Sequence, residues 1–293
     1  VAMKKSRRTV AQIKRLMAMS LVIAGLSACA TATNTSMTPN SALRATVDGD
    51  WRSAESKARD AARHPAESLS FWGLRPGMTV LEVNPGAASW WTEILAPYTR
   101  MTGGEFYATG ADLDDPKVSE RAREERAAFA QKYSDTAVYG PVKVLNWSLT
   151  SVLPPANSFD FVLVSRAFHG WMRGGTTDEY LQRIFQILKP GGILAIEQHR
   201  ANPGPQDPKA PAGYVTEAYV VEQAEKAGFR LQAKSQVNAN LKDTKDHPFG
   251  VWTLPPTRLT APFGKPADAA FDRTKYDAIG ESDRMTLRFA KPN

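Results

Sequence analysis

Glu82, Asn84 and Gly86 stand where a short apolar run ends, and their types and spacing suit ligand binding. The run 80–83 predicts a strand covered on both faces, with Glu82 at its carboxyl end. Small residues follow, and an amphipathic pattern restarts near Trp91. A strand, a tight turn and a helix in this order let the backbone approach a ligand and point free helix N–H groups at it. The segment therefore predicts an α/β protein that binds a nucleotide-like cofactor.

The elements that must position these residues alternate along the chain. Strands are predicted at 80–83, 105–109, 142–147, 159–164, 193–196, 229–236 and 285–289, and helices at 51–64, 92–98, 117–132, 180–188 and 215–227. This alternation predicts an α/β fold with a Rossmann-like, doubly wound, mostly parallel sheet and helices on both faces. The last two strands, separated by the irregular segment 246–280, predict an antiparallel strand near the C-terminus. The proline-rich loop 202–213 is long enough to form a lid or an entrance.

Composition limits the class of partner. At 293 residues with 42% hydrophobic content, the chain can bury a substantial core. Six Lys and Arg lie within residues 4–15, and no acid precedes Asp48. If residues 1–28 are removed, subtracting these six charges from the formal +7 leaves +1. A near-neutral body gives no electrostatic reason to expect nucleic acid as a partner.

The N-terminus has the layout of a secretory signal peptide over residues 1–28, with a basic opening, an apolar run and small residues after it. The run ends Leu26-Ser27-Ala28-Cys29, which resembles the bacterial lipoprotein box. We therefore expect an exported protein at the periplasmic face of a bacterial membrane, anchored by lipid on Cys29. Residues 29–50, rich in Ala, Thr, Asn and Ser, predict a flexible tether, and residues 51–293 the folded domain. Cys29 is the only cysteine, so an internal disulfide is excluded.

Taken together, these features resemble the class I S-adenosylmethionine-dependent methyltransferases. The resemblance rests on Glu82-Val83-Asn84-Pro85-Gly86-Ala87-Ala88, Ser158-Phe159-Asp160-Phe161-Val162 and Leu188-Lys189-Pro190-Gly191-Gly192-Ile193-Leu194. Shorter matches, such as Trp91-Thr92-Glu93-Ile94-Leu95-Ala96-Pro97-Tyr98, resemble a bacterial group of predicted methyltransferases that are often exported. The resemblance implies S-adenosylmethionine as the cofactor and methyl transfer as the reaction.

The resemblance also implies a set of cofactor contacts. They are Glu82, Asn84, Gly86, Asp112, Ser148 and Ser165. Asp112 is assigned to the ribose hydroxyls, with Asp114 as the alternative. Ser148 stands where many relatives carry an acid that reads the adenine amino group, and Asn146 or Trp147 can replace that acid by hydrogen bonding or stacking. Ala88 replaces a glycine of the family pattern, so its methyl group can crowd the ligand.

Methyl transfer requires an aligned nucleophile and, for some acceptors, a base. His169 follows the fourth predicted strand, and its ordinary pKa range suits a general base. The alternative is a histidine that packs in its loop. Arg166 can bind an acidic substrate, and His199 is a further candidate after strand five. The segment 165–168 lacks the Asn/Asp-Pro-Pro-aromatic signature of many nucleobase methyltransferases, which favours a small-molecule acceptor over nucleic acid.

Two other functions compete with methyl transfer, and the sequence does not predict a zinc site. Ala88, Ser148 and the export signal favour a non-catalytic envelope lipoprotein that binds a ligand with the methyltransferase fold. A nicotinamide-dependent oxidoreductase is disfavoured, because the G-x-G-x-x-G spacing is absent. The four histidines and one cysteine show no metal-ligand spacing, so no structural zinc is expected. The sequence around His247 predicts a structural turn.

Overall fold

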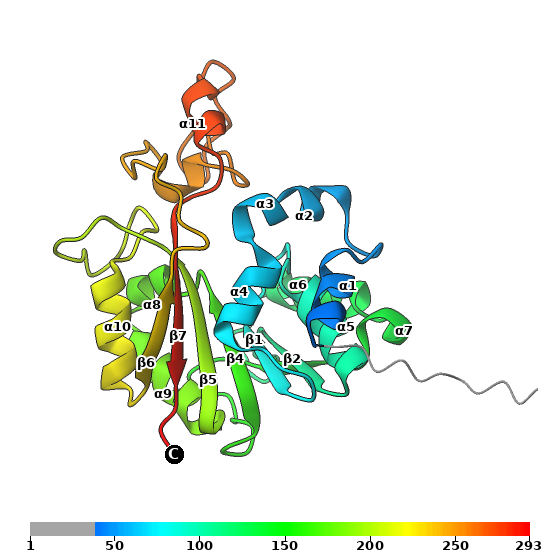
Figure 1. Ribbon diagram of the computed structural model, residues 1–293. Helices are drawn as coiled ribbons and strands as arrows, with labels where there is room; N and C mark the ends of the chain where they lie inside the picture. Colours follow the sequence, from blue (N-terminus) through cyan, green and yellow to red (C-terminus); the bar gives the residue numbers. More distant parts are fainter. Residues whose placement is uncertain (1–38) are drawn as a thin grey trace, which may run out of the picture. The chain divides into compact units, whose positions relative to one another are not determined.

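A seven-stranded sheet in the order β3-β2-β1-β4-β5-β7-β6 forms the centre of the computed structural model, which describes residues 39–293 (Figure 1). The strands are β1 (Thr79–Val83), β2 (Glu105–Gly110), β3 (Val142–Asn146), β4 (Phe159–Ser165), β5 (Leu188–His199), β6 (Arg230–Ser235) and β7 (Arg284–Ala290). The helices are α1 (Pro39–Val47), α2 (Ala54–Ala58), α3 (Asp60–Arg63), α4 (Pro65–Trp72), α5 (Thr92–Thr102), α6 (Glu120–Lys132), α7 (Thr136–Tyr139), α8 (Phe168–Gly174), α9 (Thr177–Ile187), α10 (Glu217–Lys226) and α11 (Thr274–Ile279), with a short 3₁₀ helix η1 (Gly250–Thr253).

The strand directions confirm the predicted fold class. Strands β3, β2, β1, β4 and β5 are mutually parallel, whereas β7 runs antiparallel to both β5 and β6. The chain winds outward from β1 to β3 and then returns to place β4 against the other side of β1. This reversal opens a crevice at the carboxyl ends of β1 and β4, where doubly wound sheets bind their ligands.

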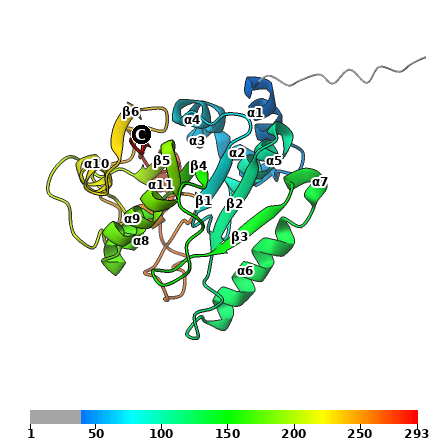
Figure 2. The ribbon, with the colours of Figure 1, turned by 90° about the horizontal axis from the view of Figure 1, so that it is seen from below.

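Both faces of the sheet are covered, because side chains alternate between the faces along each strand. Leu81 and Val83 of β1 pack into a core with α8, α9 and α10, whereas Val80 packs into a second core with α1, α4 and α5. Figures 1 and 2 show these two groups of helices on opposite sides of the sheet. By the same alternation Glu82 belongs to the face that α5 covers.

Several predicted boundaries differ from the observed ones, and two segments are built differently from the prediction. The helix predicted over 51–64 is split into α2 and α3, and His64 then adopts a left-handed backbone with φ 40°. Pro65 does not only end a helix but also begins α4. Proline fits this position because a backbone N–H in the first turn would have no partner within the helix. The turn predicted at 190–192 is part of β5, where the register against β4 shifts between Phe159 and Phe161.

The second half of the predicted tether is folded, which corrects the domain boundary. Helix α1 occupies Pro39–Val47, and its Ala42 and Leu43 are buried in the core that α4 and α5 share. These two adjacent apolar side chains pack α1 against the core, although the segment as a whole is polar. The folded domain therefore includes residues 39–50, ahead of the predicted start at 51.

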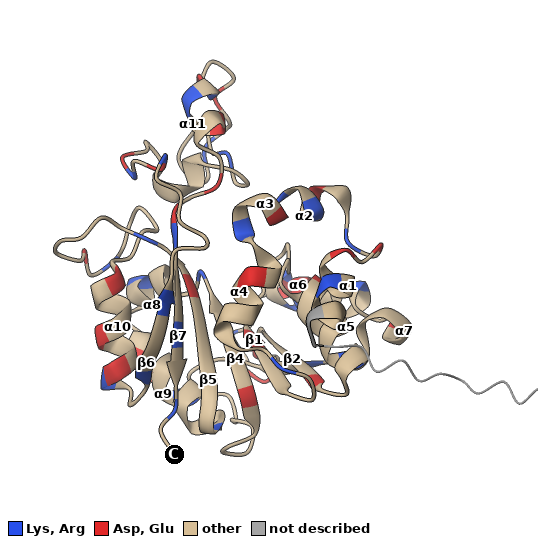
Figure 3. Cartoon of the chain, in the orientation of Figure 1, with Lys and Arg blue, Asp and Glu red and all other residues tan. Residues whose placement is uncertain are grey.

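The predicted signal peptide, Cys29 and the first part of the tether lie outside the described residues. Across residues 39–293, none of the helices combines the length and the apolar character needed to cross a membrane. Acidic and basic residues are interspersed along the described helices and strands (Figure 3).

Candidate active site

The turn after β1 separates two cavities at the carboxyl ends of the strands. Asn84 and Gly86 both have left-handed backbones, with φ 53° and 68°, and both line each cavity. The Asn84 N–H donates to Thr109 Oγ1 at 2.8 Å, which ties the turn to the end of β2. A Cβ added at Gly86 would meet no atom within 4 Å, so the backbone there borders open space.

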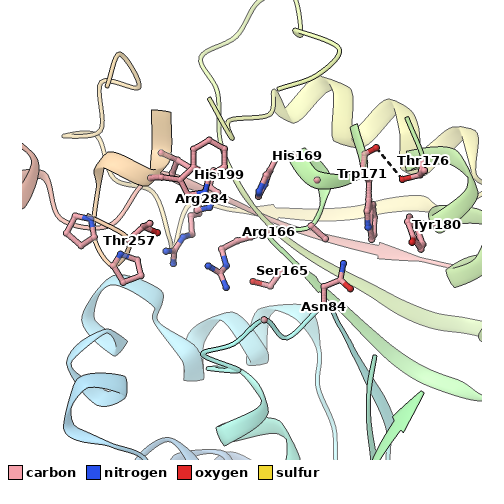
Figure 4. Close-up of a pocket in the computed structure, with 17 residues that line it drawn as sticks. Asn84, Ser165, Arg166, His169, Trp171, Thr176, Tyr180, His199, Thr257 and Arg284 are labelled. Atoms are coloured by element: carbon pink, nitrogen blue, oxygen red, sulfur yellow. Dashed lines mark hydrogen bonds between the residues drawn. The ribbon is translucent and has the colours of Figure 1, made fainter. Parts of the chain in front are cut away.

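The first cavity, here the β4 cavity, has a volume of about 480 Å³. Its charged and histidine lining, with one serine, comes from the ends of β4, β5 and β7, from the loop before α8 and from the first turn of α8: Ser165, Arg166, His169, His199 and Arg284. Trp171 and Tyr180 form one wall, and η1 with the residues after it, from Val251 to Thr257, forms another. Figure 4 shows these side chains converging from elements that are far apart in the sequence.

The second cavity, here the α6 cavity, has a volume of about 470 Å³ and lies between the β1 turn and α6. Trp147 and Phe129 supply aromatic surface, and the ends of β2 and β3 supply backbone. Arg126 and Lys132 of α6 also line it. Helix α6 has no buried residues, as expected for a solvated helix, but its inner side chains contribute to this site.

Ser165 and Glu197 lie on the sheet face that α5 covers, and Glu82 lies on the same face. Glu197 pairs with Ser165 across β4 and β5, and Ser165 Oγ donates to Glu197 Oε2 at 2.7 Å. Glu82 is buried and accepts from Thr92 Oγ1 at 2.6 Å. Burial raises the pKa of Glu82 to about 7, although the hydrogen bond from Thr92 lowers it in part. Glu82 lines neither cavity, so the structure places this predicted cofactor contact below the site.

Glu197 also holds residues that line the β4 cavity or support it. It is fully buried, and Arg284 Nη1 lies 3.0 Å from its Oε1. Trp91 Nε1 donates to its Oε2 at 3.0 Å, which links the start of α5 to the middle of the sheet. A single buried carboxylate therefore joins β4, β5, β7 and α5.

His169 and His199 are neutral side chains in this site. Burial, followed by the nearby Arg173 and Arg166, lowers the pKa of His169 to about 4. Burial and Arg284 likewise hold the pKa of His199 well below its usual range. The structure therefore does not support the prediction that an ordinary pKa suits His169 as a general base, because its environment disfavours the protonated ring.

The hydrogen bonds of His169 also argue against a general base. Gln198 Nε2 donates to the Gly213 carbonyl at 3.2 Å, which orients its amide, and lies 3.3 Å from His169 Nδ1. His169 Nδ1 is thus an acceptor, and the neutral ring carries its hydrogen on Nε2. In this tautomer the second nitrogen is a donor, not a free base.

Asp112 and Ser148, two more predicted cofactor contacts, bond to one another instead of lining a cavity. Asp112 is buried; its Oδ2 accepts from Ser148 Oγ at 2.7 Å and its Oδ1 from the Asp114 N–H at 3.1 Å. Beside them, Arg126 donates to the Ala111 carbonyl and to Asn146 Oδ1. Ser148 does not line the α6 cavity, whereas its neighbour Trp147 does.

The structure thus brings Asn84, Gly86, Ser165, Arg166 and His169 together, as predicted, and leaves Glu82, Asp112 and Ser148 outside the cavities. Ala88 is exposed and lines neither cavity, so it does not crowd them. Arg284, Trp252 and the segment 255–257 line the β4 cavity but were not predicted. They come from the irregular segment and the strand after it, where no motif signals a site. Within residues 39–293, no three His, Cys, Asp or Glu side chains gather so that they could hold a metal ion.

One family model matches part of the chain. The segment 91–196 matches the family described as a methyltransferase domain. This match supports the predicted enzyme class, an S-adenosylmethionine-dependent methyltransferase, and the predicted cofactor.

Curated relatives of this domain include two bacterial enzymes. The ubiquinone/menaquinone biosynthesis C-methyltransferase UbiE of Serratia proteamaculans is 26% identical over 124 residues, which are 42% of this chain and 43% of that protein. The enzyme of the same name from Vibrio cholerae is 26% identical over 125 residues, 42% of each chain. The match thus spans less than half the length of these relatives.

Solved structures give more distant similarities. A SAM-dependent methyltransferase from Aquifex aeolicus has a TM-score of 0.48 at 19% identity, covering 87% of this chain and 99% of that one. A putative sarcosine dimethylglycine methyltransferase from Galdieria sulphuraria has a TM-score of 0.49 at 13% identity, covering 81% and 87%.

Proposed function

We propose that this protein transfers a methyl group from S-adenosylmethionine to a small-molecule acceptor. One observation carries the proposal: the left-handed turn after β1, next to the start of the matched domain, borders two open cavities at the switch point of the sheet. Ligands of doubly wound sheets bind at this point. Two adjoining cavities provide one space for a cofactor and one for an acceptor.

The residues present fit the cofactor. Gly86 leaves open space beside the backbone, and Trp147 offers an aromatic surface in the α6 cavity, which suits an adenine ring. The backbone of Asn84 and Gly86 and the side chain of Trp147 would hold it there. When bound, S-adenosylmethionine supplies a methyl group on a positively charged sulfur. The neutral His169 ring, with its hydrogen on Nε2, donates a hydrogen bond and orients a ligand without removing a proton.

Isothermal titration of the full-length protein with S-adenosylhomocysteine tests cofactor binding. We expect saturable binding in the micromolar range, and S-adenosylmethionine should compete with S-adenosylhomocysteine for the same site. Native mass spectrometry of the purified protein should also detect co-purified adenosyl ligand. Absence of binding at millimolar S-adenosylhomocysteine would overturn the proposal.

A non-catalytic ligand-binding protein is the competing function, and the Asp112–Ser148 hydrogen bond favours it, because two expected cofactor contacts satisfy one another. A transfer assay separates the two. The protein is incubated with isotope-labelled S-adenosylmethionine and a pool of small acids and phenols, and labelled product is measured. Binding of S-adenosylhomocysteine without label transfer to any acceptor would support the binding protein.

We further propose that the protein is exported and lipid-anchored at Cys29. The proposal is supported by the order of a basic opening, an apolar run and Leu26-Ser27-Ala28-Cys29. Intact-mass measurement of the protein from bacterial membranes should show a mature chain that begins at Cys29 with attached acyl groups. Replacing Cys29 by serine should remove that mass. An unmodified cysteine in the membrane-derived protein would refute the anchor.

A further inference from the structure

Arg166 is the unpaired cation of the β4 cavity. It follows β4 with a left-handed backbone, φ 58°, and its N–H donates to the Glu197 carbonyl at 2.7 Å. Its side chain lines the cavity, but its guanidinium makes no hydrogen bond or ion pair with any residue of the described chain. Nε is buried without a partner. A buried donor without a partner costs free energy, and a strained residue at such a position is typical of a binding site.

The carboxylates near Arg166 already have other partners: Thr92 donates to Glu82, and other arginines pair with Glu197 and Glu281. Glu281 pairs with Arg59 at 2.7 Å, with Arg63 at 2.9 Å, and also with Arg284. Glu197 pairs with Arg284. Arg59, Arg63, Arg166 and Arg284 thus lie near three buried carboxylates, Glu82, Glu197 and Glu281, so the cluster has an excess of positive charge. An anionic group bound in the cavity would offset this excess.

The lining of the β4 cavity contains two arginines and no Asp or Glu among the described residues. Arg166 and Arg284 extend side by side toward Thr257 (Figure 4). The two histidines are neutral, so they add no charge that competes for an anion. Trp252 lies edge-on to His169, with ring centroids 5.8 Å apart, and Trp171 stacks on Tyr180 at 5.2 Å. Aromatic rings therefore form part of the remaining walls, beside Thr176, Thr257 and the prolines at 255 and 256, and suit the apolar part of a small ligand.

We infer that the methyl acceptor is a small organic acid whose carboxylate binds the Arg166 guanidinium. The inference rests on the proposed function, and it adds the chemical class of the acceptor and the residue that selects it. A guanidinium presents a planar pair of N–H donors that matches the two oxygens of a carboxylate. The aromatic walls then surround the part of the acceptor that carries no charge.

Benzoate and its neutral isostere benzamide test the inference by calorimetric titration of the full-length protein. Hydrogen bonds to a charged group contribute about 1.5–3 kcal/mol, which predicts that benzoate binds about 10- to 150-fold more tightly than benzamide. Arg166→Asn should abolish the difference, and asparagine tolerates the left-handed backbone at this position. Arg173→Asn is the matched control: Arg173 is exposed, lies over Trp252 and does not line the cavity, so the difference should persist.

The titration also separates the possible failures. Equal affinity for benzoate and benzamide in the unmodified protein, or no benzoate binding at millimolar concentration, would overturn the inference. Loss of S-adenosylhomocysteine binding in Arg166→Asn would also overturn it, because the guanidinium would then hold the carboxylate of the cofactor. An unmodified protein that binds benzoate selectively but not S-adenosylhomocysteine would refute the proposed function instead. The thermal unfolding midpoints of both variants show whether each is folded.

Discussion

Replacing Gly86 by alanine tests whether the turn after β1 borders the cofactor. Gly86 has φ +68°, and a Cβ there meets no atom within 4 Å. A left-handed backbone costs a residue with a Cβ about 1–2 kcal/mol, so the free energy of unfolding should fall by that amount. The same methyl group occupies space that the two cavities share. If overfilling a binding cavity costs about 1–3 kcal/mol, as in overpacked cores, the Kd for S-adenosylhomocysteine should rise about 5- to 150-fold.

Gly77→Ala is the matched control for this experiment. Gly77 has φ +78°, and a Cβ there also meets no atom within 4 Å. It precedes β1, at the end of the strand opposite Gly86, and lines neither cavity. Thermal unfolding and calorimetric titration of both variants should show similar losses of stability, about 2–4 °C for each kcal/mol, but a loss of affinity only for Gly86→Ala. Equal affinity in the two variants would refute a cofactor site at the β1 turn.

Three other changes test the buried charge, the histidine and the domain boundary. Glu197→Gln leaves Arg284 without one of its two carboxylates, so the free energy of unfolding measured in urea should fall by about 3 kcal/mol. The exposed control Glu105→Gln should lose less than about 1 kcal/mol. Similar losses in both variants would contradict the role of Glu197. The pKa of His169 is lowered to about 4 in the folded protein, so the unfolded chain takes up a proton first as the pH falls. Between about pH 7 and pH 5, the free energy of unfolding should therefore fall by about 2 kcal/mol more in the unmodified protein than in His169→Gln. If the two proteins lose stability in parallel, burial does not lower the pKa of His169. Leu43→Ala removes a buried side chain of α1 and should cost about 2–4 kcal/mol in the same urea assay, whereas an unchanged midpoint would return residues 39–50 to the tether.

The alternation of side chains along the strands separates the buried acids from the free cation of the β4 cavity. Glu82, Ser165 and Glu197 all point to the face that α5 covers, and Glu197 holds Arg284 at the edge of the β4 cavity. Arg166, one residue beyond Ser165, makes no direct ion pair with a carboxylate of the described residues. The buried acids thus hold the cavity in shape, while its free positive charge stays available for a ligand.

Much of the fold was predictable because its signals are local. A strand such as Thr79–Val83 shows a continuous apolar run, and a helix such as Thr92–Thr102 shows apolar residues at helical spacing. The small residues of the β1 turn indicate a close backbone approach without any knowledge of distant contacts. For the same reason Asn84, Gly86 and Arg166, which all lie at strand ends, were placed in the site from the sequence.

Only the tertiary structure decided which of these residues face a ligand. The insertion of β7 between β5 and β6 brings Arg284 to the cavity from a part of the chain without a motif. Asp112 stands at a predicted site position, yet its carboxylate turns to Ser148. Even the low pKa of His169 depends first on burial, and His199 and Trp252, which pack against its ring, come from distant parts of the chain. A sequence pattern specifies which face of a strand or helix is apolar, but charge, burial and hydrogen-bond partners depend on residues distant in the chain, and these meet only when the sheet assembles.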